Sequence, residues 1–124
     1  MKIAISSTDK TLESDIDPRF GRCQYFIIVD PSTLKYRAYA NESAATKGGA
    51  GIRASQFIVD LGAEVVLTGN VGPNAFETLN TAGIEILTNV VGTVRNTIER
   101  YMEGKLKKAQ SPTVGGHFGL RNHQ

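Results

Sequence analysis

Three glycine-bearing segments of this chain stand where helices are expected to begin. They are Gly48-Gly49-Ala50-Gly51, Gly69-Asn70-Val71-Gly72-Pro73-Asn74 and Gly92-Thr93. The first turn of a helix has backbone N–H groups without partners and carries the positive end of the helix dipole, so it attracts anions. If the three segments meet at one edge of a sheet, they form a single anion-binding pocket.

The pattern of apolar residues predicts the elements that would position these segments. Strands are expected at 3–6, 23–30, 35–39, 64–68 and 84–87, and helices that end at Gly62, Gly83 and Gly104. Hairpins pair antiparallel, whereas each strand-helix-strand crossover is parallel and right-handed. The prediction is therefore an α/β fold with three layers and a mixed five-stranded sheet of order 3-2-1-4-5. The second strand is antiparallel, and the sheet resembles the ribonuclease H-like one.

In that topology the ends of strands one, three, four and five share an edge with the start of strand two. Ligand sites of open α/β sheets lie at such edges. Arginine forks and asparagine amides there would contact an anion, and a cysteine thiolate would bind metal. The candidate site residues are Arg19, Arg22, Cys23, Gly48, Gly49, Gly51, Gly69, Asn70, Gly72 and Asn74.

Each candidate also has a simpler interpretation. Cys23 is either a metal ligand or a small buried residue at the start of a strand. Arg19 and Arg22 either bind an anion or lie solvated in a loop, and the glycines either admit a ligand or supply backbone angles that other residues disfavour. His117 and His123 are further possible metal donors, in the C-terminal tail.

Several motifs together resemble the dinitrogenase iron-molybdenum cofactor biosynthesis family. They are Phe20-Gly21-Arg22 before Tyr25-Phe26, Gly48-Gly49-Ala50-Gly51-Ile52, Val66-Leu67-Thr68-Gly69-Asn70-Val71-Gly72-Pro73-Asn74-Ala75 and Ala82-Gly83-Ile84. The resemblance covers roughly residues 1 to 106 and implies a carrier or scaffold for an iron-sulfur or iron-molybdenum cluster or its precursor. Many relatives have a histidine before the Phe-Gly pair, where this chain has Arg19, so a histidine ligand is not carried over.

The expected function is therefore non-catalytic binding of an anionic cluster, with cluster donor and acceptor proteins as partners. The alternatives are a phosphate- or nucleotide-binding regulatory module and a structural interaction domain with an empty pocket. An enzyme is not expected. The first strand has no carboxylate of the kind that two-metal nucleases need, and both histidines lie in the tail.

Length and composition agree with one small domain. Of the 124 residues, 40% are hydrophobic and 21% charged, and the net charge of +2 is too small to indicate nucleic acid as a partner. The single cysteine excludes a disulfide within the chain. No signal peptide or membrane span is expected. The expected location is the cytoplasm. The predicted domain is 1–108, followed by a flexible tail at 109–124.

Overall fold

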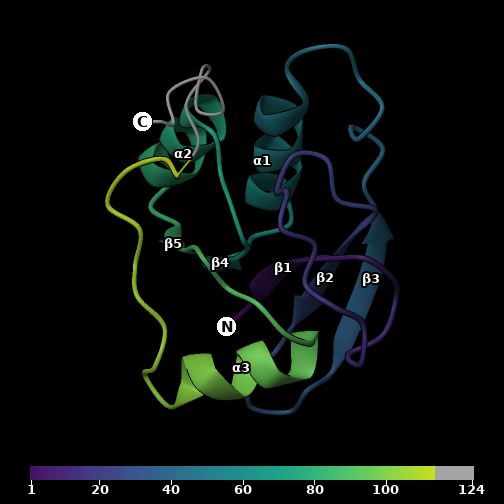
Figure 1. Ribbon diagram of the computed structural model, residues 1–124, viewed down its shortest axis with the longest axis vertical. Helices are drawn as coiled ribbons and strands as arrows, with labels where there is room; N and C mark the ends of the chain where they lie inside the picture. Colours follow the sequence, from purple (N-terminus) through teal and green to yellow (C-terminus); the bar gives the residue numbers. More distant parts are fainter. Residues whose placement is uncertain (114–124) are drawn as a thin grey trace, which may run out of the picture.

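The computed structural model describes residues 1–113 and contains five strands and three helices (Figure 1). The elements in chain order are β1 (Ile3–Ser7), β2 (Tyr25–Val29), β3 (Tyr36–Ala40), α1 (Ala50–Asp60), β4 (Val65–Leu67), α2 (Pro73–Thr81), β5 (Glu85–Leu87) and α3 (Val94–Met102).

The strands form one mixed sheet with β1 in the middle. Its order is β3-β2-β1-β4-β5. Ile3 lies opposite Val29 of the antiparallel β2 and opposite Val65 of the parallel β4. The predicted order and the antiparallel second strand are confirmed. The ribonuclease H-like designation goes beyond this topology and stays a prediction.

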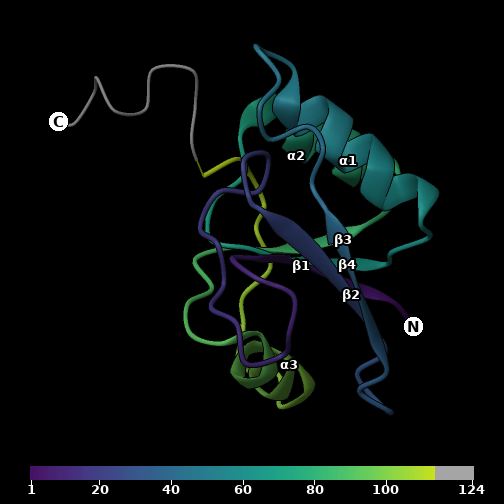
Figure 2. The same cartoon turned by 90° about the vertical axis from the view of Figure 1, so that its right-hand side faces the viewer.

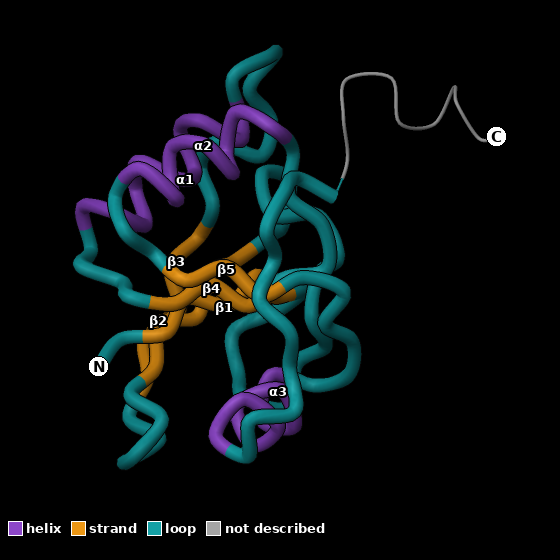
Figure 3. Tube along the Cα trace, turned by 90° about the vertical axis from the view of Figure 1, so that its left-hand side faces the viewer, coloured by secondary structure: helices purple, strands orange, loops and turns teal. Residues whose placement is uncertain are grey.

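Side chains alternate between two cores, one on each face of the sheet. One core gathers Ala4, Phe26 and Val66 with the apolar faces of α1 and α2. The other gathers Ile3, Ile27 and further residues with the apolar face of α3. The layers are therefore α1 and α2, then the sheet, then α3, as Figures 1 and 3 show. Because a strand has a period of two, neighbouring residues of β1 serve different cores.

The loop between β1 and β2 is held against the ends of the central strands. The buried hydroxyl of Ser6 donates to the Asp17 carbonyl at 2.6 Å and lies 2.7 Å from the hydroxyl of Thr68. The next residue of the loop, Pro18, accepts a 2.7 Å hydrogen bond from the Asn70 N–H. These bonds join β1, β4 and the loop at one point of the sheet edge.

The chain beyond α3 returns to the sheet before the described part ends. The Ala109 N–H donates to the Ile86 carbonyl at 2.7 Å, and the Thr113 N–H donates to the Val71 carbonyl at 3.0 Å. Ala109 and Thr113, which the sequence prediction placed in the flexible tail, are thus hydrogen-bonded to the folded domain. His117 and His123 lie outside the described residues. Within residues 1–113 no helix is both long and apolar enough to cross a bilayer.

Gly69 allows the loop to come this close, and its substitution tests the packing. A Cβ at Gly69 would lie 2.6 Å from the Pro18 Cα and 2.9 Å from its carbonyl oxygen. Gly69→Ala is therefore expected to lower the free energy of unfolding in urea by about 2 kcal/mol or more, because backbone must move. The control is Gly83→Ala, where φ is +78° and no atom lies within 4 Å. It should lose only about 1 kcal/mol, through backbone strain. Equal losses would contradict the packing role of Gly69.

Candidate anion site between two helix N-termini

A small hollow lies where α1 and α2 begin. Its volume is about 190 Å³, and its walls come from the loop before β2 and from the first turns of both helices. The lining residues are Phe20, Gly21, Gly49, Gly51, Ile52, Gly72, Pro73, Asn74 and Ala75. This volume is below the range of about 300–1,000 Å³ that is usual for drug-sized ligands, so the hollow suits a compact one.

The first turns of both helices leave their N–H groups unused. The first hydrogen bonds of the two helices run from Arg53 to Gly49 and from Phe76 to Gly72. Among the described residues, the N–H groups of Ala50, Gly51, Ile52, Asn74 and Ala75 have no partner. Neither helix has a side-chain cap or an acidic residue in its first turn. Two positive dipole ends therefore meet at the hollow without a compensating carboxylate in either first turn.

The glycines around the hollow differ in what they do. Gly48 and Gly49 have φ of 72° and 70°, the left-handed region, and a Cβ at either would meet no atom within 4 Å. Gly21 has a contact role, because a Cβ there would lie 3.0 Å from the backbone of Gly51. Gly72 has φ of −78° and ψ of 173°, a conformation that any residue adopts. The backbone conformation at position 72 therefore does not require glycine.

Arg22 and Asn41 tie the loop before β2 to the segment that leads into α1. Arg22 Nη1 donates to the carbonyls of Ala44 at 2.7 Å and Thr46 at 2.6 Å. The buried Asn41 amide donates to the carbonyls of Gly21 at 3.1 Å and Cys23 at 3.0 Å. Arg22 is thus a clamp on the backbone rather than a group aimed at a ligand. Nothing in the local sequence marks Asn41 as part of the site, because only the fold brings it to Gly21.

Two other predicted site residues hold the same loop. Arg19 forms an ion pair with the buried Asp17, 3.3 Å from Nε to Oδ1, with 63% of its own side chain exposed. The Asn70 amide group donates to the Pro18 carbonyl at 3.3 Å. With Gly69 packed on Pro18, these residues position the Phe20 wall of the hollow, and neither Asn70 nor Gly69 is among its lining residues.

The start of α3, at Gly92-Thr93, does not line the hollow. The expectation that three helix N-termini meet in one pocket is therefore wrong, and only those of α1 and α2 do so. α3 lies on the opposite face of the sheet (Figure 3). The Val94 and Arg95 N–H groups donate to the carbonyls of Ser14 and Leu12, both at 2.8 Å. The Thr93 hydroxyl caps the Asn96 N–H at 3.1 Å. The loop at 12–16 therefore occupies the positive end of this helix, and Gly92-Thr93 belongs to its packing.

Cys23 lies in the core behind the hollow. It has no solvent exposure, and its thiol donates to the Phe20 carbonyl at 3.3 Å. Burial, with a smaller contribution from the nearby Asp17 carboxylate, raises the pKa of the thiol to about 12. A metal ligand must be a thiolate, which this setting disfavours. The geometry therefore favours the packing interpretation of Cys23 over ligation.

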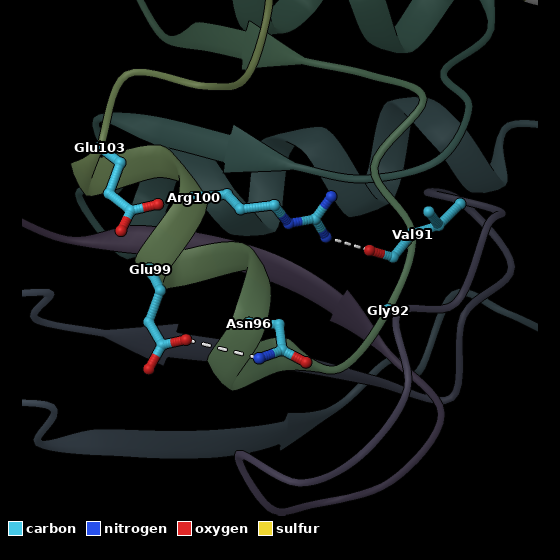
Figure 4. Close-up of a pocket in the computed structure, with 6 residues that line it drawn as sticks. All are labelled: Val91, Gly92, Asn96, Glu99, Arg100 and Glu103. Carbon is cyan, nitrogen blue, oxygen red and sulfur yellow. Dashed lines mark hydrogen bonds between the residues drawn. The ribbon is translucent and has the colours of Figure 1, made fainter.

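No ready-made metal centre accompanies the hollow. Residues 1–113 contain no group of three His, Cys, Asp or Glu side chains placed to hold a metal ion. A larger hollow of about 360 Å³ lies at α3 and includes Glu99, Arg100 and Glu103 (Figure 4). The Arg100 guanidinium donates there to the Val91 carbonyl. With two carboxylates and a cation that already has a partner, this second hollow lacks the chemistry of an anion site.

Comparison with known proteins decides the family. The family model described as dinitrogenase iron-molybdenum cofactor matches residues 1–104. The chain belongs to this dinitrogenase cofactor family. The match includes the whole hollow, since its lining residues run from Phe20 to Ala75.

Structures related to this member of the dinitrogenase cofactor family share its fold. The apo form of the orange protein from Desulfovibrio gigas is 38% identical, with a TM-score of 0.87, covering 90% of this chain and 95% of that one. A NifB-like protein from Thermotoga is 37% identical, with a TM-score of 0.79 and coverage of 90% and 96%. In sequence, an uncharacterised protein of Methanocaldococcus jannaschii is 30% identical over 112 residues, and the match covers 87% of this chain and 91% of that protein.

The packing role of Cys23 in this family member predicts an unreactive thiol. Iodoacetamide at pH 8 should label the folded protein at least 100-fold more slowly than the urea-unfolded chain, because a raised pKa and burial both suppress the thiolate. Cys23→Ser should lower the unfolding free energy by about 1–3 kcal/mol through its buried hydroxyl. Cys23→Ala is the control that adds no polar group. Rapid labelling of the folded protein would contradict the assignment.

Because Arg22 holds the carbonyls of Ala44 and Thr46, loss of its guanidinium is expected to increase local opening of the segment that leads into α1. Arg22→Lys keeps the charge but is too short to span both carbonyls, so amide exchange at 44–49 should accelerate roughly tenfold, equivalent to about 1.4 kcal/mol. The matched variant is Arg53→Gln, which removes an exposed cation from the first turn of α1 and leaves the clamp intact. Acceleration in Arg53→Gln but not in Arg22→Lys would show that charge, and not the clamp, orders this segment.

Proposed function

We propose that this chain is a non-catalytic carrier or scaffold that binds an anionic iron-sulfur or iron-molybdenum type cluster, or its precursor, in the hollow between α1 and α2. The observation that carries the proposal is the pair of uncapped helix starts. Four of the five residues with unused N–H groups line a compact hollow, and neither first turn contains a carboxylate. Family membership supplies the class of cargo.

Binding in this site rests on hydrogen bonds from the backbone. Charge-assisted bonds from N–H groups to an anion are stronger than neutral ones, and each dipole end adds about 0.3–1 kcal/mol. Sulfide or oxide atoms at the surface of a cluster are suitable acceptors. Without a thiolate or imidazole bond from the described residues, release to an acceptor protein requires no ligand exchange on the domain. Cluster donor and acceptor proteins are the partners that this role implies.

The size of the hollow supports a cluster more than a nucleotide. A volume of about 190 Å³ holds a compact anion, whereas a nucleotide also needs walls for its base and sugar. The catalytic alternative has little support at the same edge. The ends of β1 and β4 contribute the hydroxyls of Ser6 and Thr68, and the nearby Asp17 is buried and paired with Arg19.

Tetrathiomolybdate, a compact anion with sulfide acceptors, provides the test. Titration into the labelled protein should shift the amide resonances of residues 19–23, 48–52 and 72–75. Gly72→Val should weaken binding at least tenfold, because it enlarges a residue that lines the hollow while the backbone angles remain allowed. Cys23→Ala should keep the wild-type affinity.

A matched glycine pair separates binding from backbone strain. Gly49→Ala and Gly83→Ala place a Cβ at φ of +70° and +78°, and in both cases no atom lies within 4 Å. Both variants should lose similar stability, but only Gly49→Ala should lose affinity, since Gly83 lies after α2, away from the hollow. Shifts confined to Lys105–Lys108 would mean that the site is elsewhere.

A further inference from the structure

One edge of the sheet is open among the described residues. β3 pairs with β2 on one side only, whereas the other edge strand, β5, is bridged by Lys108. Figure 1 shows β3 at the end of the sheet opposite β5, and Figure 2 views the molecule from that side, with the β2–β3 hairpin toward the reader. The outer side of β3 therefore offers unpaired backbone groups to another chain.

The hydrogen bonds to β2 decide which residues of β3 face outward. Asn41, directly after β3, donates its N–H to the Gln24 carbonyl at 2.9 Å. Because alternate residues of an antiparallel strand bond to the same neighbour, every second residue before Asn41 also bonds to β2. The N–H and carbonyl groups of the remaining residues of β3 point outward, and these residues are Tyr36, Ala38 and Ala40.

A second copy of β3 matches this edge. Antiparallel pairing joins outward residues to outward residues, and the register that uses all of them places Ala38 opposite Ala38 of the second copy and Tyr36 opposite Ala40. Roughly six backbone hydrogen bonds form in this register. The side chains at its centre are small and uncharged, and each Tyr36 side chain, 42% exposed in the single chain, lies opposite an alanine. The edge is therefore complementary to itself, as a two-fold interface requires.

The same register brings a cation of the second copy to a hollow where β3 ends, which we call the β3 hollow. Its volume is about 270 Å³, and it is lined by Tyr39, Ala40, Asn41, Glu42, Ser43 and Phe57. Arg37 of the second copy stands opposite Tyr39 in a non-hydrogen-bonded pair, in which opposing side chains are closest. Arg37 and Tyr39 share the face of the sheet that α1 covers, since the Tyr39 ring packs edge-on against Phe57 with centroids 5.6 Å apart. The guanidinium therefore meets the mouth of the β3 hollow.

The charges on this edge also match a second copy. A charged residue in the middle of an edge strand opposes pairing unless the incoming strand offers it a partner. Here the incoming strand offers Arg37 an aromatic ring, Tyr39, and a carboxylate, Glu42. Among residues 1–113, Glu42 forms no ion pair, and the Arg37 guanidinium contacts only the face of its own Tyr39 ring, 5.9 Å from the centroid. Pairing therefore gives both charges a partner, twice by symmetry.

We propose that this chain forms a two-fold symmetric homodimer in which β3 pairs with β3 of a second copy and Arg37 of each copy enters the β3 hollow of the other. The two five-stranded sheets then become one continuous sheet. Strands of five residues bury less surface than a standard interface, so the association is weak and depends on concentration. The β3 hollow shares no lining residue with the anion hollow, and the dimer therefore does not depend on the proposed function.

Charge reversal tests the contact, with sedimentation equilibrium of the full chain between roughly 10 µM and 1 mM as the measurement. Arg37→Glu places two carboxylates together and should raise the dimer dissociation constant at least tenfold, and Glu42→Arg should do the same by placing two cations together. The double variant restores opposite charges and should return to within about threefold of wild type. Lys107→Glu is the matched control, because it makes the same charge change at an exposed position away from β3.

Two further measurements report the strand pairing. Ala38→Pro removes the outward N–H at the centre of the register without removing a bond to β2, and should weaken the dimer at least tenfold while urea unfolding shows a folded chain. In a mixture of labelled and unlabelled chains, a nuclear Overhauser effect should join the Hα atoms of Arg37 and Tyr39, which neighbour each other only between copies.

Three results would overturn the dimer. They are a monomer throughout this concentration range, a dissociation constant that Arg37→Glu leaves unchanged, and a double variant no tighter than its two parents. If Ala38→Pro does not fold, the charge-reversal variants still decide the outcome. Tetrathiomolybdate binding should be the same in Arg37→Glu as in wild type, so failure of the dimer and failure of the proposed function are separate results.

Discussion

The site depends on the contact between Pro18 and Gly69. At Gly69 even a methyl group would overlap the Pro18 backbone, and the Asn70 N–H and Pro18 carbonyl join across the same point. The Ser6 hydroxyl holds the neighbouring Asp17 in place by donating a hydrogen bond to its carbonyl. Together these contacts hold the loop before β2 across the ends of β1 and β4. The loop then presents Phe20 and Gly21 as one wall, against which the first turn of α1 packs.

A site made from backbone follows from this packing. A Cβ at Gly21 would lie 3.0 Å from the Gly51 backbone, and one at Gly51 would lie 3.3 Å from the Ala75 Cβ. The polar groups among the lining residues are therefore mainly backbone groups of the first helical turns, together with the Asn74 amide. The larger polar side chains nearby are engaged in holding the loop. They do so through the ion pair of Arg19 with Asp17, the bonds of Arg22 to Ala44 and Thr46, and those of Asn41 to Gly21 and Cys23. These side chains shape the hollow without entering it.

The chain after α3 links protection of the sheet to the site. An open edge strand offers unpaired N–H and carbonyl groups to other chains, and the bridge between Leu87 and Lys108 covers part of β5. The same segment continues to Val71, where Thr113 makes its two hydrogen bonds. The segment that protects the β5 edge therefore also brings Thr113 to the residues just before α2.

The sequence by itself determined the order and sense of the strands. Hydrophobic periodicity separates strands from helices, and the short turn between β2 and β3 and the two helical crossovers fix the relative direction of the strands that they join. It also indicated the glycine segments at 48–51 and 69–74. Only the tertiary structure decided which helix starts stay open, because the carbonyls that close α3 come from Leu12 and Ser14, about 80 residues earlier in the chain. Burial of Cys23 and the reach of Asn41 were decided in the same way. Local pattern reports which face of an element is apolar, whereas the partners of a polar atom depend on distant segments that meet only in the folded protein.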